Sequence, residues 1–339
     1  MKWMMAIFVL FIGFFYFFLD TPYVSEQQSF VEKKEANEQI TAQGLGALIG
    51  ATEEMIEKQF GKPARIDRSA YDYVWWIYNG HSSSYMQIGF LNGRVVTAYA
   101  CGDEVNIAPF KVNASISELF QKIPIRDEIT VQLDEGIYRF ELSEEDLTFQ
   151  PVVQLGHVYA QLYIDRFTGK LSSVRFMDGE TFVKLRPYEL VYRGELPVSS
   201  NANGSFQAEI EQANARQIFD ITNVIRQRHG IRSLQWDEHI AKIAYEHSKD
   251  MKKNGYFAHE SPKYGDLKER LTNGDVRFQM AGENIAAEYV DGIAAVEAWL
   301  NSKSHRETLL NEEFTHLGVG VFERYYTQDF IKVLSDMPH

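Results

Sequence analysis

Three phrases decide how this chain folds: FAHESP at residues 257–262, AGENIA at 281–286 and WLNSKSHRETLLNEEFTHLGVGV at 299–321. Each contains a histidine or a glutamate near residues that fix the backbone. Imidazole and carboxylate groups from separate segments are the usual ingredients of a shared polar cleft, and often of a divalent-metal site. We therefore expect the three phrases to meet, and the candidate residues are His259, Glu283 and His305.

The segments around these phrases have the periodicity of helices and strands. Apolar residues recur at helical spacing over 206–229 and again over 238–254, and a glycine follows each segment. A further helix is predicted over 292–310, and two alternating strands over 318–323 and 329–334. This part of the chain is therefore predicted to mix helices with β-sheet.

Residues 44–196 show an internal duplication of a helix followed by short strands. Thr52 is the predicted N-cap of the first helix and Ser115 that of the second, with stops at Gly61 and Pro124. The predicted strands, which are rich in aromatic and β-branched residues, are 73–78, 85–91, 94–99, 138–142, 148–153, 158–164 and 171–176. Two helix-plus-meander units indicate an α+β domain with antiparallel sheet, to which we assign no chemistry.

The N-terminus contains a candidate membrane anchor, residues 1–24. The stretch 3–19 carries no charge and is rich in Phe, Ile, Leu and Met, with Lys2 before it and Asp20 after it. Such a stretch is typical of a transmembrane helix, and the preceding positive charge favours an N-terminus inside and a body outside the cell membrane. A cleaved signal peptide, which would leave a secreted protein, is the alternative.

Two polar segments divide the rest of the chain. Residues 25–43 are charge-rich and lack an apolar stripe, so they are predicted to be a spacer. Residues 197–205, PVSSNANGS, are small and polar, as linkers are. The predicted organisation is an anchor at 1–24, a spacer at 25–43, a duplicated domain at 44–196, a linker at 197–205 and a C-terminal domain at 206–339.

Composition limits the classes of function. The net charge of −13 argues against a nucleic-acid partner, because binding phosphates needs basic patches. Cys101 is the only cysteine, which excludes an internal disulfide and a CxxC metal or redox motif.

The chain from about residue 208 to 334 resembles a CAP domain, the superfamily of cysteine-rich secretory, antigen 5 and pathogenesis-related proteins, and in particular its bacterial branch. The matching stretches are NVIRQRHGIRSLQWDEHIAKIAYEHSKDMKKNGYFAHESP, AGENIA and AWLNSKSHRETLLNEEFTHLGVGVF. Residues 44–196 resemble the CAP-associated domain of membrane-anchored proteins from Bacillus-type bacteria. The implied fold class is α+β: a C-terminal α-β-α sandwich preceded by the duplicated helix-plus-antiparallel-meander domain and an N-terminal transmembrane helix.

The resemblance implies a cleft lined by two histidines and acidic groups, which in some cases holds a divalent cation. Carried over to this sequence, the histidines are His259 and His305, and the acid is Glu283. The eukaryotic pattern has a second glutamate three residues after the tryptophan, where this chain has Ser302. Asn284 is expected to tie down the backbone beside Glu283.

Other charged residues near these phrases are given ordinary roles. His247 lies on the inner side of a predicted helix and is expected to be a core histidine. Arg270 and Arg306 are expected to form solvated ion pairs with their neighbours Glu269 and Glu307, which contribute little to stability.

Three roles stay open for the His/Glu cluster. Two histidines, one carboxylate and a water can hold zinc in a tetrahedral site, although Ser302 supplies no carboxylate and indicates weak binding. A histidine beside a glutamate can also act as a general base near neutral pH. Finally, the same side chains can hold the fold together by hydrogen bonds alone.

These roles lead to three hypotheses of function. The leading one is a membrane-anchored extracytoplasmic protein that binds a lipid, wall fragment, peptide or protein partner at the cell envelope, without catalysis. The second is a metal-assisted envelope hydrolase, either a peptidase or a wall-active enzyme, that uses His259, Glu283 and His305. The third is a structural or regulatory module.

Overall fold

The computed structural model describes residues 40–121, 123–200, 204 and 206–334, which belong to one compact unit. The predicted anchor, residues 25–39 of the predicted spacer and linker residues 201–203 and 205 lie outside the described residues. Within the described ranges, no helix is both long and apolar enough to cross a membrane.

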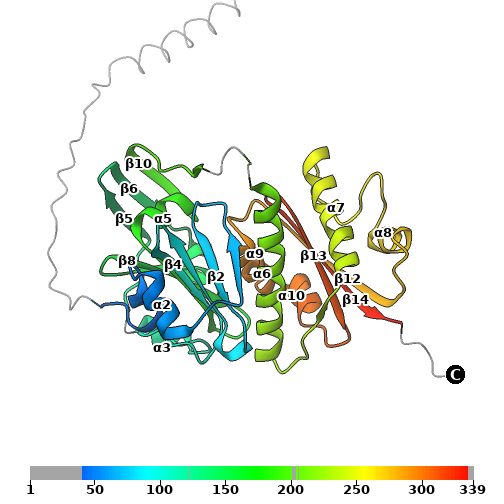
Figure 1. Cartoon of the computed structure of the whole chain (residues 1–339), viewed down its shortest axis with the longest axis horizontal. Helices are drawn as coiled ribbons and strands as arrows, with labels where there is room; N and C mark the ends of the chain where they lie inside the picture. Colours follow the sequence, from blue (N-terminus) through cyan, green and yellow to red (C-terminus); the bar gives the residue numbers. More distant parts are fainter. Residues whose placement is uncertain (1–39, 122, 201–203, 205, 335–339) are drawn as a thin grey trace, which may run out of the picture. The chain divides into compact units, whose positions relative to one another are not determined.

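The N-terminal half is built on a seven-stranded antiparallel sheet (Figure 1). It begins with the short helices η1 (Gly44–Leu48) and α2 (Glu53–Phe60), and Thr52 caps α2 as predicted by accepting a hydrogen bond from the Met55 amide. The next elements are β1 (Arg65–Arg68), β2 (Val74–Tyr78), η2 (Ser82–Ser84), β3 (Met86–Leu91) and β4 (Arg94–Ala100). The turn between β3 and β4 contains Asn92 and Gly93 with φ of 52° and 73°, the left-handed values that a type I′ hairpin turn requires.

The second unit of the predicted duplication adds three strands to the same sheet. These are β7 (Val152–Leu155), β8 (Val158–Asp165) and β9 (Lys170–Met177), and the strand order is β1-β2-β3-β4-β9-β8-β7. The hairpins β3–β4 and β8–β9 therefore meet through the antiparallel pair β4–β9. Each unit thus places its last hairpin at the centre of one sheet.

Residues 148–153 do not form the predicted strand. Helix α4 (Glu144–Phe149) covers their start, because Ser143 and Asp146 make a capping box that begins a helix. Strand β7 starts only at Val152. Local capping chemistry at Ser143 therefore overrides the β propensity of the residues that follow.

A second, three-stranded sheet was not predicted as such. Strand β5 (Glu128–Leu133), which was missed although its residues alternate between exposed and buried, pairs with β6 (Gly136–Glu141). Strand β10 (Glu189–Gly194) pairs with the other edge of β6. The short helices α3 (Ile116–Phe120) and α5 (Gly179–Leu185) complete this half.

The C-terminal half has a four-stranded sheet in the order β11-β13-β14-β12. Its elements are α6 (Gln207–Arg228), β11 (Gln235–Trp236), α7 (Glu238–Asn254), α8 (Leu267–Asn273), β12 (Phe278–Ala287), α9 (Gly292–Leu300), α10 (Lys303–Leu309), β13 (His316–Phe322) and β14 (Tyr325–Val333). The pairs β13–β14 and β14–β12 are antiparallel, whereas the short β11 runs parallel to β13. Helices α6 and α7 have nearly the predicted bounds.

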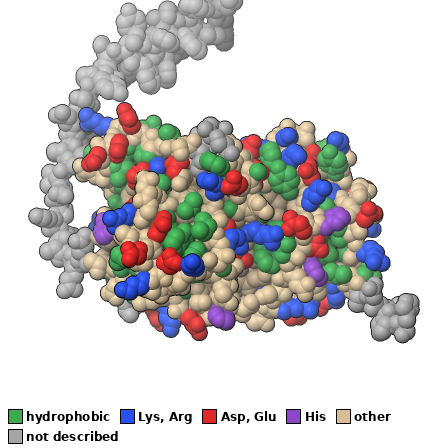
Figure 2. Space-filling model, in the orientation of Figure 1, with side chains coloured by type: hydrophobic (Ala, Val, Ile, Leu, Met, Phe, Trp, Pro, Cys, Tyr) green, Lys and Arg blue, Asp and Glu red, His purple; other side chains and the backbone are tan. Residues whose placement is uncertain are grey.

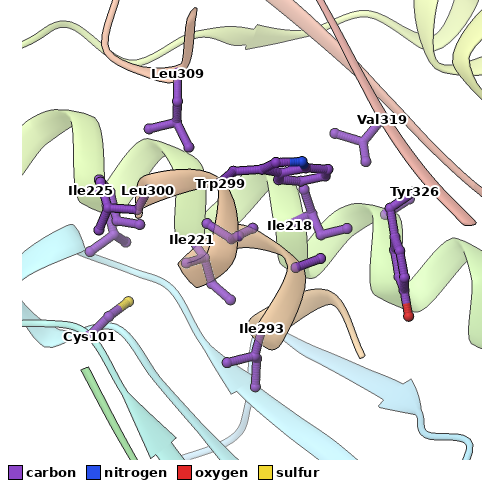
Figure 3. Packing of buried hydrophobic residues seen from close by; sticks show 14 of the residues in the cluster. Cys101, Ile218, Ile221, Ile225, Ile293, Trp299, Leu300, Leu309, Val319 and Tyr326 are labelled. Carbon is purple, nitrogen blue, oxygen red and sulfur yellow. The ribbon is translucent and has the colours of Figure 1, made fainter. Parts of the chain in front are cut away.

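Alternate residues of β13 face two helical layers. Gly318 and Gly320 face α7, and a Cβ at Gly320 would lie 1.9 Å from the backbone nitrogen of Tyr245, a clash that only glycine avoids. The β13 residues that face the other way, Leu317, Val319 and Val321, are in one core cluster with α6 and α9. Figure 3 shows Val319 of this cluster together with Ile218 of α6 and Trp299 of α9. The sheet therefore lies between α7 on one face and α6 with α9 on the other.

The two halves share one hydrophobic core. Figure 3 shows Cys101, which follows β4, in the same buried cluster as Ile221 of α6 and Trp299 of α9. Trp75 of β2 and Tyr99 of β4 belong to this cluster as well. Helix α6 contacts both β1 and β13 (Figure 1), and α9 contacts β8, so both helices join the halves.

Ion pairs cross the same junction. Arg175 of β9 pairs with Asp291 before α9, and the Arg175 side chain is fully buried. Asp165 at the end of β8 binds Arg306 of α10 through two N–O contacts of 2.9 Å, so Arg306 does not form the solvated pair with Glu307 that the sequence suggested. These contacts fix the halves relative to each other.

The predicted helix over 292–310 is in fact two helices, α9 and α10. Asn301 interrupts it, because its side chain accepts a hydrogen bond from the Arg166 amide and donates one to the Ile164 carbonyl, both at 2.8 Å. Ser302 then serves as the N-cap position of α10. A polar side chain that bonds to backbone elsewhere competes with helix continuation.

Charges on the visible face are mixed. In Figure 2, Lys and Arg side chains lie among Asp and Glu side chains of the described residues, not in one continuous basic surface.

Candidate functional site

Strand β12 carries the AGENIA phrase and positions Glu283 and Asn284. In the register with β14, Glu283 lies opposite Asp329 and Asn284 lies opposite Gln328. Consecutive strand residues point to opposite faces of a sheet. Accordingly, Glu283 contacts side chains from α7 and α8, whereas Asn284 donates a hydrogen bond of 3.1 Å to the His305 carbonyl in α10.

Glu283 is the centre of a buried ionic network. Its Oε1 accepts a hydrogen bond of 2.8 Å from His259 Nδ1, and its Oε2 accepts one from Arg270. The Glu283 side chain is 3% exposed and that of Arg270 is 4% exposed, whereas that of His259 is 58% exposed. A buried carboxylate, held by a buried guanidinium, thus orients an imidazole that faces solvent.

Asp329 lies opposite Glu283 in the sheet, and the two buried carboxyl groups differ in pKa. Burial raises the pKa of Glu283, but the hydrogen bond from His259 and the charge of Arg270 outweigh burial, so the pKa of Glu283 is below its ordinary value. Burial, and then the negative charge of Glu283, raise the pKa of Asp329 well above its usual range. Two adjacent buried carboxyl groups resist ionising together. Glu283 is therefore the charged member and Asp329 the neutral one.

His247 supports the segment that carries His259. It is buried, and its Nε2 donates a hydrogen bond of 3.1 Å to the carbonyl of Ala258. Burial lowers the pKa of His247 to about 4, although the nearby carboxylate of Glu283 acts in the opposite direction. His247 is therefore neutral near pH 7, and it is buried in the core as predicted. Its Nε2 lies 3.8 Å from Oε2 of Glu283.

His305 and Ser302 form a second, smaller group. A hydrogen bond of 2.9 Å joins His305 Nδ1 to the Ser302 hydroxyl. Burial lowers the pKa of His305, and the charge of His259 lowers it further. The contacts thus link His259 directly to Glu283, and His305 to Ser302 and Asn284. That all five share one pocket stays a prediction.

Both halves of the chain match known protein families. Residues 219–334 match the model of the cysteine-rich secretory protein family (CAP), and residues 49–188 match the CAP-associated N-terminal model. The uncharacterized membrane protein YlbC of Bacillus subtilis strain 168 is 50% identical over 310 residues, which cover 91% of this chain and 90% of YlbC. The chain belongs to the cysteine-rich secretory protein family.

Solved structures of CAP proteins have the same fold. An extracellular protein with an SCP domain from Bacillus anthracis strain Ames has a TM-score of 0.81 and 45% identity, with 89% of this chain and 99% of that chain covered. A cysteine-rich secretory protein from Staphylococcus aureus Mu50 has a TM-score of 0.75 and 25% identity, with 86% and 93% covered. The predicted α+β CAP fold with antiparallel sheets is confirmed for the described residues.

Two members of this CAP network were not predicted as site residues. Arg270 was assigned to a solvated pair with Glu269, but its side chain is buried against Glu283, and Glu269 instead makes a capping box with Asp266. That capping box starts α8, but no local pattern around the helix indicates that Arg270 lies against Glu283. Asp329 was predicted only as the start of a strand, although it shares a face of that strand with the buried Ile331.

The described residues do not offer the three metal ligands that the sequence suggested. Among them, no group of three or more His, Cys, Asp and Glu side chains is arranged to hold a metal ion. Both oxygens of Glu283 are engaged by His259 and Arg270, so Glu283 does not fit as a direct ligand. The Nε2 atoms of His259 and His305 remain as ligand atoms, fewer than the three protein ligands of a catalytic zinc site.

Two cavities of the CAP protein lie away from Glu283. One, of about 710 Å³, lies between α4 and the β8–β9 turn of the N-terminal half and α9 and α10, and its lining includes Ser302. The other, of about 350 Å³, is lined by α6, α7 and β13. Neither is lined by His259, Glu283 or His305.

Proposed function

We propose that this CAP protein is anchored in the cell membrane and binds a ligand or partner at the cell envelope through His259, Glu283 and His305. The apolar stretch 3–19 supports the anchor. The name of YlbC as a membrane protein and the extracellular description of the Bacillus anthracis protein support the same location. Wall fragments, lipids and peptides are the ligand classes present there.

The observation that carries this proposal is the exposed imidazole of His259 above a buried ion pair. Apolar side chains can stabilise a protein core as well as a buried ion pair does, so Glu283 and Arg270 are not needed for stability alone. Their effect is to hold His259 in one orientation with Nε2 free of the Glu283 contact. A pre-oriented polar group of this kind is suited to recognition, because binding then costs little conformational entropy.

We expect the protein to co-sediment with purified peptidoglycan sacculi or with phosphatidylglycerol vesicles, and His259→Ala to weaken that binding about tenfold, the usual loss for a hydrogen bond to a charged or strongly polar group. His239→Ala, which alters an exposed histidine on α7, is the matched control and should bind like the unchanged protein. Equal binding by both variants would contradict a role for His259. Absence of binding to both sacculi and vesicles would contradict a wall or lipid ligand and favour a protein partner.

A hydrolase is the second candidate, and the same dyad favours it. His259 donates from Nδ1 to a carboxylate and is 58% exposed, which is the arrangement of a general base. A divalent cation, if held by the Nε2 atoms of His259 and His305, would polarise a substrate carbonyl or activate a water. Glu283 would then orient His259 from behind without touching the cation.

Zinc binding to this pair is expected to be weak and exchangeable, and to be lost in His259→Ala and in His305→Ala. Only neutral imidazole binds a metal, so the affinity should fall as the pH drops through about 6.5. Burial lowers the pKa of His305, so His305 keeps its metal-binding form at lower pH than an exposed histidine does. Titration calorimetry at several pH values tests this, and unchanged affinity in both variants would rule out the pair as a metal site.

A further inference from the structure

The cavity of about 710 Å³ is a second candidate site, separate from the His/Glu network. It lies at the junction of the two halves and is lined by residues of both. Its volume is within the range of small-ligand sites, which occur preferentially at such junctions. Its lining contains charged groups of both signs together with aromatic rings.

Two cations, Arg166 and Lys303, are among the residues that line the cavity. The Arg166 guanidinium lies 4.7 Å from the ring centre of Phe149 and 5.7 Å from that of Phe167, and it donates to the Asn301 carbonyl. Among the described residues, neither cation has a carboxylate within ion-pair distance. Their charges are therefore available to a carboxylate of a ligand.

Acidic groups line the cavity from α4 and from α9. Glu145 is exposed and, within the described part of the chain, has no ion-pair partner, whereas Asp146 is held by the capping box with Ser143. Glu297 is fully buried, and burial raises its pKa, although a hydrogen bond from Ser173 opposes the shift. Oxygen Oε2 of Glu297 has no hydrogen-bond partner among the described residues, which is unusual for a buried polar atom.

The walls of the cavity are held in place from both halves. The Asn301 side chain is hydrogen-bonded to the backbone of Arg166 and Ile164. Arg306 makes its two contacts with Asp165, the residue between them in the sequence. Ser302 lines the cavity and is hydrogen-bonded to His305. A ligand would thus meet a preformed site, in which the Ser302 hydroxyl of the wall is hydrogen-bonded to the His305 imidazole.

We propose that this cavity binds a short zwitterionic peptide. Arg166 and Lys303 take its carboxylate, Glu145 takes its ammonium group, and Phe149 and Phe167 contact its apolar part. Groups of both signs in one lining match a ligand with both charges better than a simple anion or cation. This site goes beyond the proposed function, since it uses neither His259 nor Glu283.

The test is titration calorimetry of the full-length protein with the tetrapeptide Ala-Leu-Gln-Ala in four forms: free ends, N-acetylated, C-amidated and both. We expect the free peptide to bind, and each blocked end to weaken binding about tenfold, as loss of a charged hydrogen bond does. Arg166→Gln should weaken binding of the free peptide but leave the affinity for the C-amidated peptide unchanged. Glu145→Gln should weaken binding of the free peptide but leave the affinity for the N-acetylated peptide unchanged.

Lys62→Gln, an exposed lysine near the end of α2, is the control and should bind all four forms like the unchanged protein. Lys303→Gln repeats the carboxylate test if Arg166→Gln does not fold. The nuclear magnetic resonance signals of the His305 imidazole should shift when the peptide binds, because Ser302 lines the cavity and is hydrogen-bonded to His305. Equal binding of all four forms, absence of binding, or equal affinities in the site and control variants would overturn the proposal.

Discussion

Replacing Arg270 with alanine is expected to lower the free energy of unfolding by about 3–5 kcal/mol, the usual effect of breaking a buried ion pair. The Arg270 and Glu283 side chains are 4% and 3% exposed, so the variant leaves a buried carboxylate without its cation. Arg270 also donates to the carbonyls of His259 and Gly265 at 2.8 and 3.1 Å, so the segment between them loses its anchor. Urea denaturation of the two proteins measures the difference.

Lys268→Ala on the same helix is the control, because Lys268 is exposed and substitutions at such surface positions change stability by less than about 0.5 kcal/mol. Adding Glu283→Gln to the Arg270→Ala variant should restore part of the lost free energy of unfolding, because the buried side chain at position 283 is then neutral. The pKa of Glu283 is lowered, so its ionised form stabilises the fold above its ordinary pKa and that contribution is lost as the pH falls. The difference between wild type and Arg270→Ala should therefore shrink in acid, and a constant difference would contradict the assignment of charge to Glu283.

Asp291→Asn should also destabilise the protein by about 3–5 kcal/mol, because it removes the partner of the buried Arg175 at the junction of the halves. Asp291 is the N-cap of α9 and accepts a hydrogen bond from the Ala294 amide. Asparagine caps a helix about as well as aspartate, so the substitution removes the charge and keeps the cap. Denaturation monitored by circular dichroism gives the change in free energy.

Asp237→Asn is the matched control for this substitution. Asp237 caps α7 by accepting hydrogen bonds from the His239 and Ile240 amides, and no ion pair involves it among the described residues. It should therefore change stability by less than about 0.5 kcal/mol. If the two variants lost equal stability, the cap and not the ion pair would account for the effect. Because the halves share one core, both should unfold in a single transition in Asp291→Asn.

Local signals in the sequence were sufficient for the long helices and the tight hairpin. Helices α6 and α7 were predicted within a residue or two, because each carries a sustained apolar period and is followed by glycine. Asn92 and Gly93 lie between the predicted strands 85–91 and 94–99, and an Asn-Gly pair is the residue type that such a tight hairpin turn requires. These features depend on residues close together in the chain.

Features that depend on distant residues were missed. The helix predicted over 292–310 breaks at Asn301 because that side chain bonds to Ile164 and Arg166, more than a hundred positions earlier. Arg270 became a site residue because β12 brings Glu283 to it, which no local pattern around α8 indicates. The meeting of His259 and Glu283 was expected from the residue types of the three phrases and from the family resemblance, not from periodicity.

The two glycines of β13 control more than the packing of one helix. Gly318 and Gly320 let α7 lie directly on the sheet, on the face where Glu283 also points. Helix α7 carries His247, which holds the Ala258 carbonyl next to His259. How closely α7 brings His247 to the Glu283 carboxylate is thus set by the absence of two methyl groups on β13, which β14 separates from β12 in the sheet.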